Sequence, residues 1–209
     1  MKILVATGNR HKFAEISAIF AVPHVQLCGL HEFENAPVVE ENGLTFESNA
    51  ILKASVLARF TGGWALADDS GLEVEHLGGE PGVWSARYAG LPCNDSANNV
   101  KLLSRMNGVE DRKAQFRCVI ALSDPAGASR TVSGACPGRL LTAPRGAHGF
   151  GYDPLFVPDG HDQTFAELDI GVKNRISHRA MALQAALLAW GQVLADDPAT
   201  WADSGRDHF

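Results

Sequence analysis

The chain opens with MKILVATGNRHKFAEISAIF, residues 1–20, a stretch that indicates its fold class. Residues 1–6 form an apolar run that predicts a short buried strand, and residues 13–20 repeat apolar side chains at helical spacing. Gly8 and its small neighbours turn the strand into the helix, so backbone N–H groups of the new helix point at the turn. Lys12 adds a positive charge there. This pattern is typical of a phosphate-binding turn in an α/β protein, although a plain strand-to-helix turn is the alternative.

Composition indicates a globular chain of ordinary size. It has 209 residues, of which 45% are hydrophobic and 20% charged, enough for a substantial core. The net charge of -6 argues against a broad nucleic-acid surface. We find no membrane-spanning or secretory segment, and the four cysteines are widely spaced, which favours reduced thiols. We therefore expect a cytoplasmic protein whose partners include no nucleic-acid polymer and no membrane.

The order of the predicted elements favours a mixed sheet. After the opening turn they are helices at about 45–61, 94–106 and 174–194, and strands at 64–67, 114–121, 129–136 and 154–158. Helices and strands alternate early, whereas a hairpin dominates the middle of the chain. We expect one domain over residues 1–195 and a polar C-terminal tail over residues 196–209.

Two pairs of acidic residues, each followed closely by glycine, lie far apart in the sequence. The first is Glu40-Glu41-Asn42-Gly43, and the second is Asp68-Asp69-Ser70-Gly71, which is expected to end the strand at 64–67. Mg²⁺ binds through one or two carboxylates together with substrate phosphates, and a carboxylate can also deprotonate an attacking water. A solvated acidic turn is the alternative, but the phosphate-type turn in the same chain favours a metal site.

A third cluster combines aromatic and basic side chains late in the chain. The segment Gly149-Phe150-Gly151-Tyr152-Asp153-Pro154 places two rings between glycines, and either ring can stack on a flat base. Lys173, His178 and Arg179 lie near the start of the last predicted helix, where positive charge opposes the helix dipole. An anionic or carbonyl-rich ligand explains their position, and simple exposure to solvent is the alternative.

Together these clusters resemble the inosine triphosphate pyrophosphatase family, the noncanonical purine nucleoside triphosphate pyrophosphatases of the RdgB and Ham1 type. The motifs that carry the resemblance follow family order between residues 7 and 179: Thr7-Gly8-Asn9-x-x-Lys12, Glu40-Glu41-x-Gly43-x-Thr45-Phe46-x-x-Asn49-Ala50-x-x-Lys53-Ala54, Ala67-Asp68-Asp69-Ser70-Gly71-Leu72, Pro81-Gly82-Val83-Trp84-Ser85-Ala86-Arg87-Tyr88, Gly149-Phe150-Gly151-Tyr152-Asp153-Pro154 and Ser177-His178-Arg179. Arg10 and His11 occupy variable positions of the first motif.

The resemblance implies an elongated, two-lobed α/β fold around a long mixed sheet with flanking helices, and an active-site cleft between the lobes. It also implies a homodimer. The implied reaction is hydrolysis of a purine nucleoside triphosphate to the monophosphate and pyrophosphate, with Mg²⁺ as the cofactor. The implied substrates are ITP, dITP and XTP, so such an enzyme clears deaminated purines from the nucleotide pool.

The same resemblance implies roles for individual residues. Asp69 is expected to accept a proton and to bind the metal, and Lys53 to assist near the phosphates, with Asp68 as a further candidate. Glu40 is the first choice for the second metal ligand, and Glu41 stays open. The implied substrate-binding residues are Thr7, Gly8, Asn9, Arg10, His11 and Lys12 around the triphosphate, Ser70 on the nucleotide, and Phe150, Gly151, Tyr152, Asp153, Lys173, His178 and Arg179 around the base.

Hydrogen bonding supplies a reason for base selectivity. Hypoxanthine and xanthine carry a carbonyl at position 6, where adenine carries an amino group, and buried donors left unpaired against that amino group cost about 1–3 kcal/mol each. Two rival interpretations remain: a Maf-type pyrophosphatase with another base preference, and a nucleotide sensor without turnover. The late aromatic and basic motifs argue against the first, and the intact acidic residues argue against the second.

Overall fold

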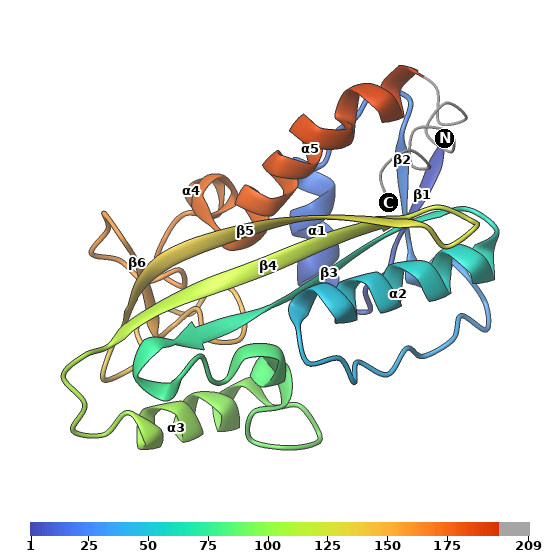
Figure 1. Ribbon diagram of the computed structural model, residues 1–209. Coiled ribbons are helices and arrows are strands. Elements are labelled where there is room, and N and C mark those ends of the chain that lie inside the picture. Colours follow the sequence, from blue (N-terminus) through green and yellow to red (C-terminus); the bar gives the residue numbers. More distant parts are fainter. Residues whose placement is uncertain (197–209) are drawn as a thin grey trace. The chain divides into compact units, whose positions relative to one another are not determined.

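The computed structural model of the chain describes residues 1–196. Its helices and strands, labelled in Figure 1, are β1 (Lys2–Val5), α1 (Arg10–Ile19), β2 (Gln26–Gly29), α2 (Phe46–Thr61), β3 (Trp64–Val74), α3 (Asp95–Arg105), β4 (Lys113–Ser123), β5 (Ser129–Leu140), β6 (Phe156–Pro158), α4 (Ile170–Ile176) and α5 (His178–Asp196). Of the predicted tail at 196–209, only the last residue of α5 falls within this range.

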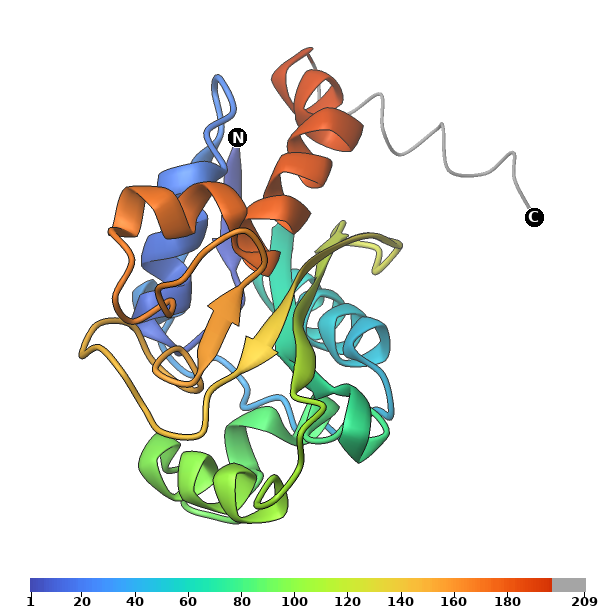
Figure 2. The ribbon, with the colours of Figure 1, turned by 90° about the vertical axis from the view of Figure 1, so that its left-hand side faces the viewer.

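The strands form one six-stranded sheet in the order β2-β1-β3-β4-β5-β6. Strand β1 runs parallel to both β2 and β3, whereas β5 and β6 are antiparallel, as their opposed arrows in Figure 2 show. The predicted α/β class with a mixed sheet is therefore confirmed. Within residues 1–196, no helix combines the length and the apolar character that crossing a membrane requires.

The chain divides into two compact units. The N-terminal unit comprises residues 1–69, 119–133 and, among the described residues, 182–196, and the central unit comprises residues 70–118 and 134–181. The strands β3, β4 and β5 each contribute residues to both units. In β3 the boundary falls between two residues of the acidic motif, since Asp69 belongs to the N-terminal unit and Ser70 to the central unit. The position of a substrate cleft stays a prediction.

In the N-terminal unit, α2 begins and ends where its sequence indicates. Thr45 is the N-cap residue, and its side-chain oxygen accepts a hydrogen bond from the backbone N–H of Ser48 at 3.1 Å. Gly62 ends the helix in the left-handed conformation, with φ of 63°. Both boundaries were predicted, and both are confirmed. They matter because α2 carries two of the side chains that reach the acidic residues.

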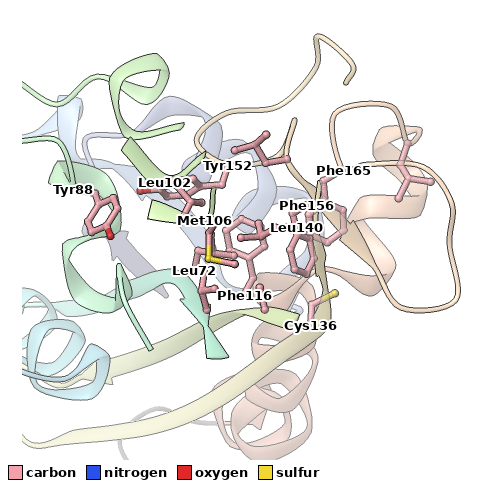
Figure 3. Packing of buried hydrophobic residues seen from close by; sticks show 14 residues of the cluster. Leu72, Tyr88, Leu102, Met106, Phe116, Cys136, Leu140, Tyr152, Phe156 and Phe165 are labelled. Atoms are coloured by element: carbon pink, nitrogen blue, oxygen red, sulfur yellow. The ribbon is translucent and has the colours of Figure 1, made fainter. Parts of the chain in front are cut away.

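The central unit has an aromatic core, shown in Figure 3. The rings of Phe116 and Phe156 pack edge to face with their centroids 4.8 Å apart, and Phe165 lies 5.2 Å from Phe156. Edge-to-face and tilted rings are the favoured geometries for such pairs. Helix α3 contributes Leu102 to this core, and its N-cap residue Asn94 accepts a hydrogen bond from the backbone N–H of Ala97 at 2.9 Å.

Strand β3 is longer than its sequence suggests. The prediction that it ends at Asp68 is wrong, because β3 continues through the acidic motif to Val74. Asp68 and Asp69 are only 1% and 5% exposed. Strand β3 lies between β1 and β4 in the sheet, and pairing with neighbouring strands overrides the low strand propensity of aspartate. The motif is therefore held on a rigid strand rather than on a flexible turn.

The last predicted helix is interrupted. A single helix over 174–194 is wrong, because α4 ends at Ile176 and α5 starts at His178. Ser177 between them has an extended backbone, and its side-chain oxygen accepts a hydrogen bond from the backbone N–H of Ala180 at 3.2 Å. Serine at this position caps the start of α5, a preference that the sequence alone could have signalled. Lys173 consequently lies inside α4.

Candidate active site

The turn after β1 is built around Asn9, the N-cap residue of α1. Its side-chain oxygen accepts hydrogen bonds from the backbone N–H groups of His11 at 2.9 Å and Lys12 at 3.2 Å. The backbone N–H of Asn9 donates a hydrogen bond to Thr7 Oγ1 at 3.1 Å. An open pocket of about 630 Å³ adjoins the turn and is lined by Thr7, Gly8, Asn9, Arg10, Phe13, Gly29, Leu30 and His31. Four of the predicted triphosphate-binding residues, 7–10, therefore line one pocket.

Two lysines bring acidic residues from distant parts of the chain together in the N-terminal unit. Lys12, in the first turn of α1, lies 3.0 Å from Asp68, measured from Nζ to Oδ2. Lys53, on α2, lies 2.8 Å from Glu41 Oε2 and 3.7 Å from Asp69 Oδ1. The two acidic motifs thus meet at Lys53, and we call these five residues the acidic cluster.

Burial and charge together change the proton affinities in this cluster. Burial is the main reason that the pKa of Asp69 is raised to about 6, and the negative charge of Glu41 adds to the effect. Lys53, Lys12 and a hydrogen bond from Asn49 act in the opposite direction. For Lys53, burial alone would lower the pKa, but the surrounding carboxylates outweigh it and the pKa is raised. Lys53 is therefore charged at neutral pH, and Asp69 is the group poised to exchange a proton.

The cluster suits a metal ion that brings further ligands with it. Within residues 1–196, no three histidine, cysteine, aspartate or glutamate side chains gather closely enough to hold a metal ion by themselves. The cluster nevertheless carries three carboxylates and two ammonium groups, an excess of one negative charge. Mg²⁺ commonly binds through one or two carboxylates and completes its shell with water and substrate phosphates. The donors present fit a divalent cation that arrives with a triphosphate.

The choice between the two neighbouring glutamates is clearer in the structure than in the sequence. Glu41 reaches Lys53 and is partly buried, whereas Glu40, the first choice from the sequence, is exposed. The two glutamates therefore differ in both exposure and contacts. The contacts thus favour Glu41 as the second acid beside Asp69.

In the central unit, the motif at residues 149–154 is organised by a buried carboxylate. Asp153 Oδ2 accepts hydrogen bonds from the backbone N–H of Phe150 at 2.9 Å and from Lys173 Nζ at 2.6 Å. Gly149 has φ of 76°, and a side chain there would collide with the same carboxylate oxygen. The backbone N–H of Gly151 donates to Asp95 Oδ2 at 2.7 Å, which ties the motif to α3. Asp153 and Gly151 thus shape the motif.

Phe150 lies at the centre of the predicted base-binding residues. Lys173 Nζ lies 5.0 Å from the centroid of its ring, and the Arg179 guanidinium lies 5.9 Å from it. Arg179 is 1% exposed, and its Nη2 donates a hydrogen bond to Ser70 Oγ at 2.9 Å. Ser70, Phe150 and Arg179 come from three separate sequence motifs, and Lys173 lies between two of these motifs in the chain. The structure brings all four residues together within the central unit.

His178 and Tyr152 also serve the core. The His178 ring stacks on Phe116 with centroids 4.7 Å apart and planes at 12°. Tyr152 is 3% exposed, and its hydroxyl donates to the backbone carbonyl of Ser85 at 2.9 Å. Burial raises the pKa of the Tyr152 hydroxyl. The two aromatic residues of the motif therefore differ: Tyr152 is packed into the core, whereas Phe150 is half-buried.

Sequence reasoning missed several residues that support these groups. Asn49 donates a hydrogen bond to Asp69 Oδ2 at 3.0 Å, although the sequence motif assigned it no role. Asp95 holds the backbone of Gly151, and Phe116 supports His178. The signal for Asn49 was its place on α2, four residues before Lys53, because residues at this spacing share one helix face. The other two contacts join segments too far apart for any spacing rule to predict.

Comparison with known proteins places this geometry in a family. The sequence profile of the Ham1 family matches residues 3–189. A protein of Desulforamulus reducens named dITP/XTP pyrophosphatase is 51% identical over 189 residues, covering 90% of this chain and 94% of its own. A Geobacter sulfurreducens protein of the same name is 52% identical over 184 residues, covering 87% of this chain and 92% of its own.

Solved structures agree with the sequence comparison. The Staphylococcus aureus Ham1 protein is similar with a TM-score of 0.84 and 40% identity, covering 92% of this chain and 100% of its own. A HAM1 protein from Coxiella burnetii is similar with a TM-score of 0.84 and 40% identity, covering 94% and 100%. The matches extend over both units and over every candidate site residue, and the chain therefore belongs to the Ham1 family.

Proposed function

We propose that this chain hydrolyses dITP, XTP and ITP to the nucleoside monophosphate and pyrophosphate. The observation that carries the proposal is the position of Lys53 between Glu41 and Asp69, which gathers a buried carboxylate, a second acid and a positive charge. Relatives named dITP/XTP pyrophosphatase, at 51% and 52% identity, support the choice of substrates. Clearance of deaminated purines from the nucleotide pool follows from this specificity.

Asp69 is the proposed base of the reaction. A water oxygen bonds to the α-phosphorus, the bond from that phosphorus to the α–β bridging oxygen breaks, and pyrophosphate leaves. Asp69 takes the proton from the water. A pKa of about 6 leaves the carboxylate ionised at neutral pH while keeping it more basic than an ordinary aspartate. Lys12 and Lys53 offset negative charge on the phosphates.

We propose Mg²⁺ as the metal, held by Asp69 and Glu41 together with the phosphates of the substrate. When bound, it neutralises phosphate charge and polarises the phosphoryl oxygens. The excess of one negative charge in the acidic cluster supports this choice, as does the preference of Mg²⁺ for few protein ligands. Glu41 replaces Glu40 in this proposal because Glu41 contacts Lys53.

The central unit is proposed to bind the base. Phe150 stacks on the purine, and Lys173, His178 and Arg179 donate hydrogen bonds to its oxygens. A 6-carbonyl accepts such bonds and a 6-amino group does not, so adenine nucleotides leave buried donors unpaired. The gathering of Lys173 and Arg179 around Phe150 supports this assignment.

We further propose that the protein is a cytoplasmic homodimer, as the family resemblance implies. The four cysteines are free, and three of them are buried, in keeping with a reducing compartment. Sedimentation at equilibrium tests the oligomeric state: one species of twice the 22.3 kDa chain mass is expected. A single species of the chain mass contradicts the dimer.

One assay tests the reaction and the specificity together. Pyrophosphate release is measured with dITP, XTP, ITP, dATP, dGTP and dTTP, each with and without Mg²⁺. We expect rapid release from the first three, slow release from dATP and dTTP, and little release without a divalent cation. Equal rates on dITP and dATP contradict the proposed base selectivity. Binding of dITP without any product identifies a sensor instead of an enzyme.

A further inference from the structure

One face of α2 reaches both acidic motifs through two residues a helical turn apart. Lys53 bridges Glu41 and Asp69 by charge, as described above. Asn49 makes a second bridge by hydrogen bonds, and it is 0% exposed. Its amide nitrogen donates to Asp69 Oδ2 at 3.0 Å. The acidic loop at residues 40–43 and Asp69 of β3 thus both contact the same face of α2.

The attachment of Asn49 to the loop has two points of contact. The backbone N–H of Gly43 donates to Asn49 Oδ1 at 2.8 Å, and Asn49 Nδ2 donates to the Gly43 carbonyl at 3.4 Å. A reciprocal pair of this kind fixes the direction of the loop as well as its distance, as a pair of hydrogen bonds does between two strands. The loop backbone is therefore held at Gly43, two residues after Glu41.

Gly43 is required for this attachment. A Cβ at Gly43 would lie 2.6 Å from Asn49 Oδ1 and would collide with the hydroxyl oxygen of Ser48. Only a residue without a side chain lets the loop backbone approach the amide so closely. The glycine and the asparagine, six residues apart, therefore form one structural device.

We propose that Asn49 is a positioning residue that locks the acidic loop and the Asp69 carboxylate into one fixed arrangement. The carboxylate rotates easily about its last bond, and the donor on Asn49 holds Oδ2 while Oδ1 faces Lys53. Asn49 is 0% exposed, and its amide contacts Asp69 and Gly43, so it acts through Asp69 and the acidic loop. The effect on turnover rests on the proposed function, whereas the attachment of the loop does not.

The chain contains a matched control. Asn98, on α3, is 2% exposed and also holds a loop by two backbone hydrogen bonds. Its Oδ1 accepts from the N–H of Ala89 at 2.7 Å, and its Nδ2 donates to the Ala86 carbonyl at 3.0 Å. Asn49 and Asn98 are therefore both buried, and each holds a loop by hydrogen bonds. They differ in that Asn49 also donates to the Asp69 carboxylate. Comparing them separates positioning from stability.

The experiment compares Asn49→Leu with Asn98→Leu in the full chain, below the temperature at which either variant unfolds. Hydrogen exchange of the peptide covering residues 40–44 is read by mass spectrometry, and kcat and KM are measured with dITP. For Asn49→Leu we expect faster exchange in this peptide and a kcat about 100-fold lower, because a small misplacement of a reacting group costs this much. KM is expected to stay within about threefold, since the phosphate and base residues are untouched. Asn98→Leu should leave both readouts near wild type.

Two further variants keep the test decisive if Asn49→Leu does not fold. Asn49→Asp keeps an acceptor for the Gly43 N–H but cannot donate to Asp69, so kcat should fall while exchange at residues 40–44 stays slow. Gly43→Ala should accelerate that exchange and lower kcat together. A folded Asn49→Asp variant whose kcat matches wild type overturns the proposal, and so does unchanged exchange in Gly43→Ala. If the wild type itself releases no pyrophosphate, the proposed function fails, and the exchange results alone then decide whether Asn49 holds the loop.

Discussion

Each of the two units buries a lysine beside an aspartate, and the two pairs differ in what surrounds them. Lys173 and Asp153, in the central unit, are each 4% exposed and lie 2.6 Å apart, and the lysine also faces the ring of Phe150. Lys53, in the N-terminal unit, lies between Glu41 at 2.8 Å and Asp69 at 3.7 Å. The first pair is close and has no net charge, whereas Lys53 faces two carboxylates, which leaves a net negative charge.

One type of ion pair can therefore serve two purposes in this protein. A balanced buried pair with further hydrogen bonds is a rigid frame, and it suits the binding of a neutral, flat base. Burial raises the pKa of Asp69, and the negative charge left around Lys53 attracts a cation, which suits bond cleavage at a phosphate. The four predictions below test this division, in order of decreasing expected effect.

Removing the proposed base has the largest expected effect. Asp69→Asn keeps the size of the side chain but cannot accept a proton from water, so kcat with dITP should fall by about 100- to 10,000-fold. Nucleotide binding should persist, because the phosphate and base residues are unchanged. Steady-state pyrophosphate release and calorimetric binding of dITP check the two halves of this expectation. Near-normal turnover in the variant rules out Asp69 as the base.

Breaking the balanced pair should have a large effect on stability. Lys173→Met leaves Asp153 buried without its ammonium partner, and the free energy of unfolding should drop by about 3–5 kcal/mol. Urea unfolding measures it. The double variant Lys173→Met with Asp153→Asn is the control and should recover much of the loss, because no charge is then left buried. If Lys53→Met destabilises the protein equally and spares kcat, the two pairs do not differ in purpose.

Replacing a side chain that is proposed to donate a hydrogen bond to the purine should change substrate selectivity more than the rate with dITP. His178→Phe preserves the aromatic stack on Phe116 while removing the hydrogen-bonding nitrogens. The ratio of kcat/KM for dITP over dATP should fall by about 10- to 100-fold, the value of one buried hydrogen bond. Competition assays with both nucleotides measure the ratio directly. An unchanged ratio places discrimination elsewhere than at His178.

Burial of the Asp69 carboxylate should also appear as a pH-dependent cost in stability. The folded-state pKa of Asp69, about 6, exceeds its ordinary value of 3.8, so the folded state holds the proton more tightly. Its stabilising contribution is complete below pH 3.8 and is lost as the pH rises through about 6. Asp69→Asn should therefore become more stable than wild type by about 1–3 kcal/mol at pH 7 without added metal.

Urea unfolding of both proteins at pH 4 and pH 7 measures this difference. The gap between variant and wild type should be small at pH 4 and should widen by pH 7. A gap that is equal at both pH values shows that the Asp69 carboxylate carries no such penalty. Added Mg²⁺ and nucleotide should narrow the gap at pH 7, because binding compensates the buried charge.

Local sequence rules predicted many of the elements but misjudged two of their boundaries. The start of α2 at Thr45 and its end at Gly62 were predictable because capping depends on neighbouring residues. The continuation of β3 through Asp68 was not readable, since strand pairing supplies the energy that the local sequence lacks. The break at Ser177 was not predicted, although the preference of serine for N-cap positions indicates it.

Residue types and spacing in the printed sequence were enough to indicate an α/β chain, a phosphate-type turn, two acidic motifs and an aromatic motif. Those features depend on neighbours within a few positions. The preference for Glu41 over Glu40, the burial of Tyr152, the raised pKa of Asp69 and the bonds of Asn49 came from folding alone. Each depends on a distance between segments that are separate in the chain, and sheet pairing and helix packing set those distances.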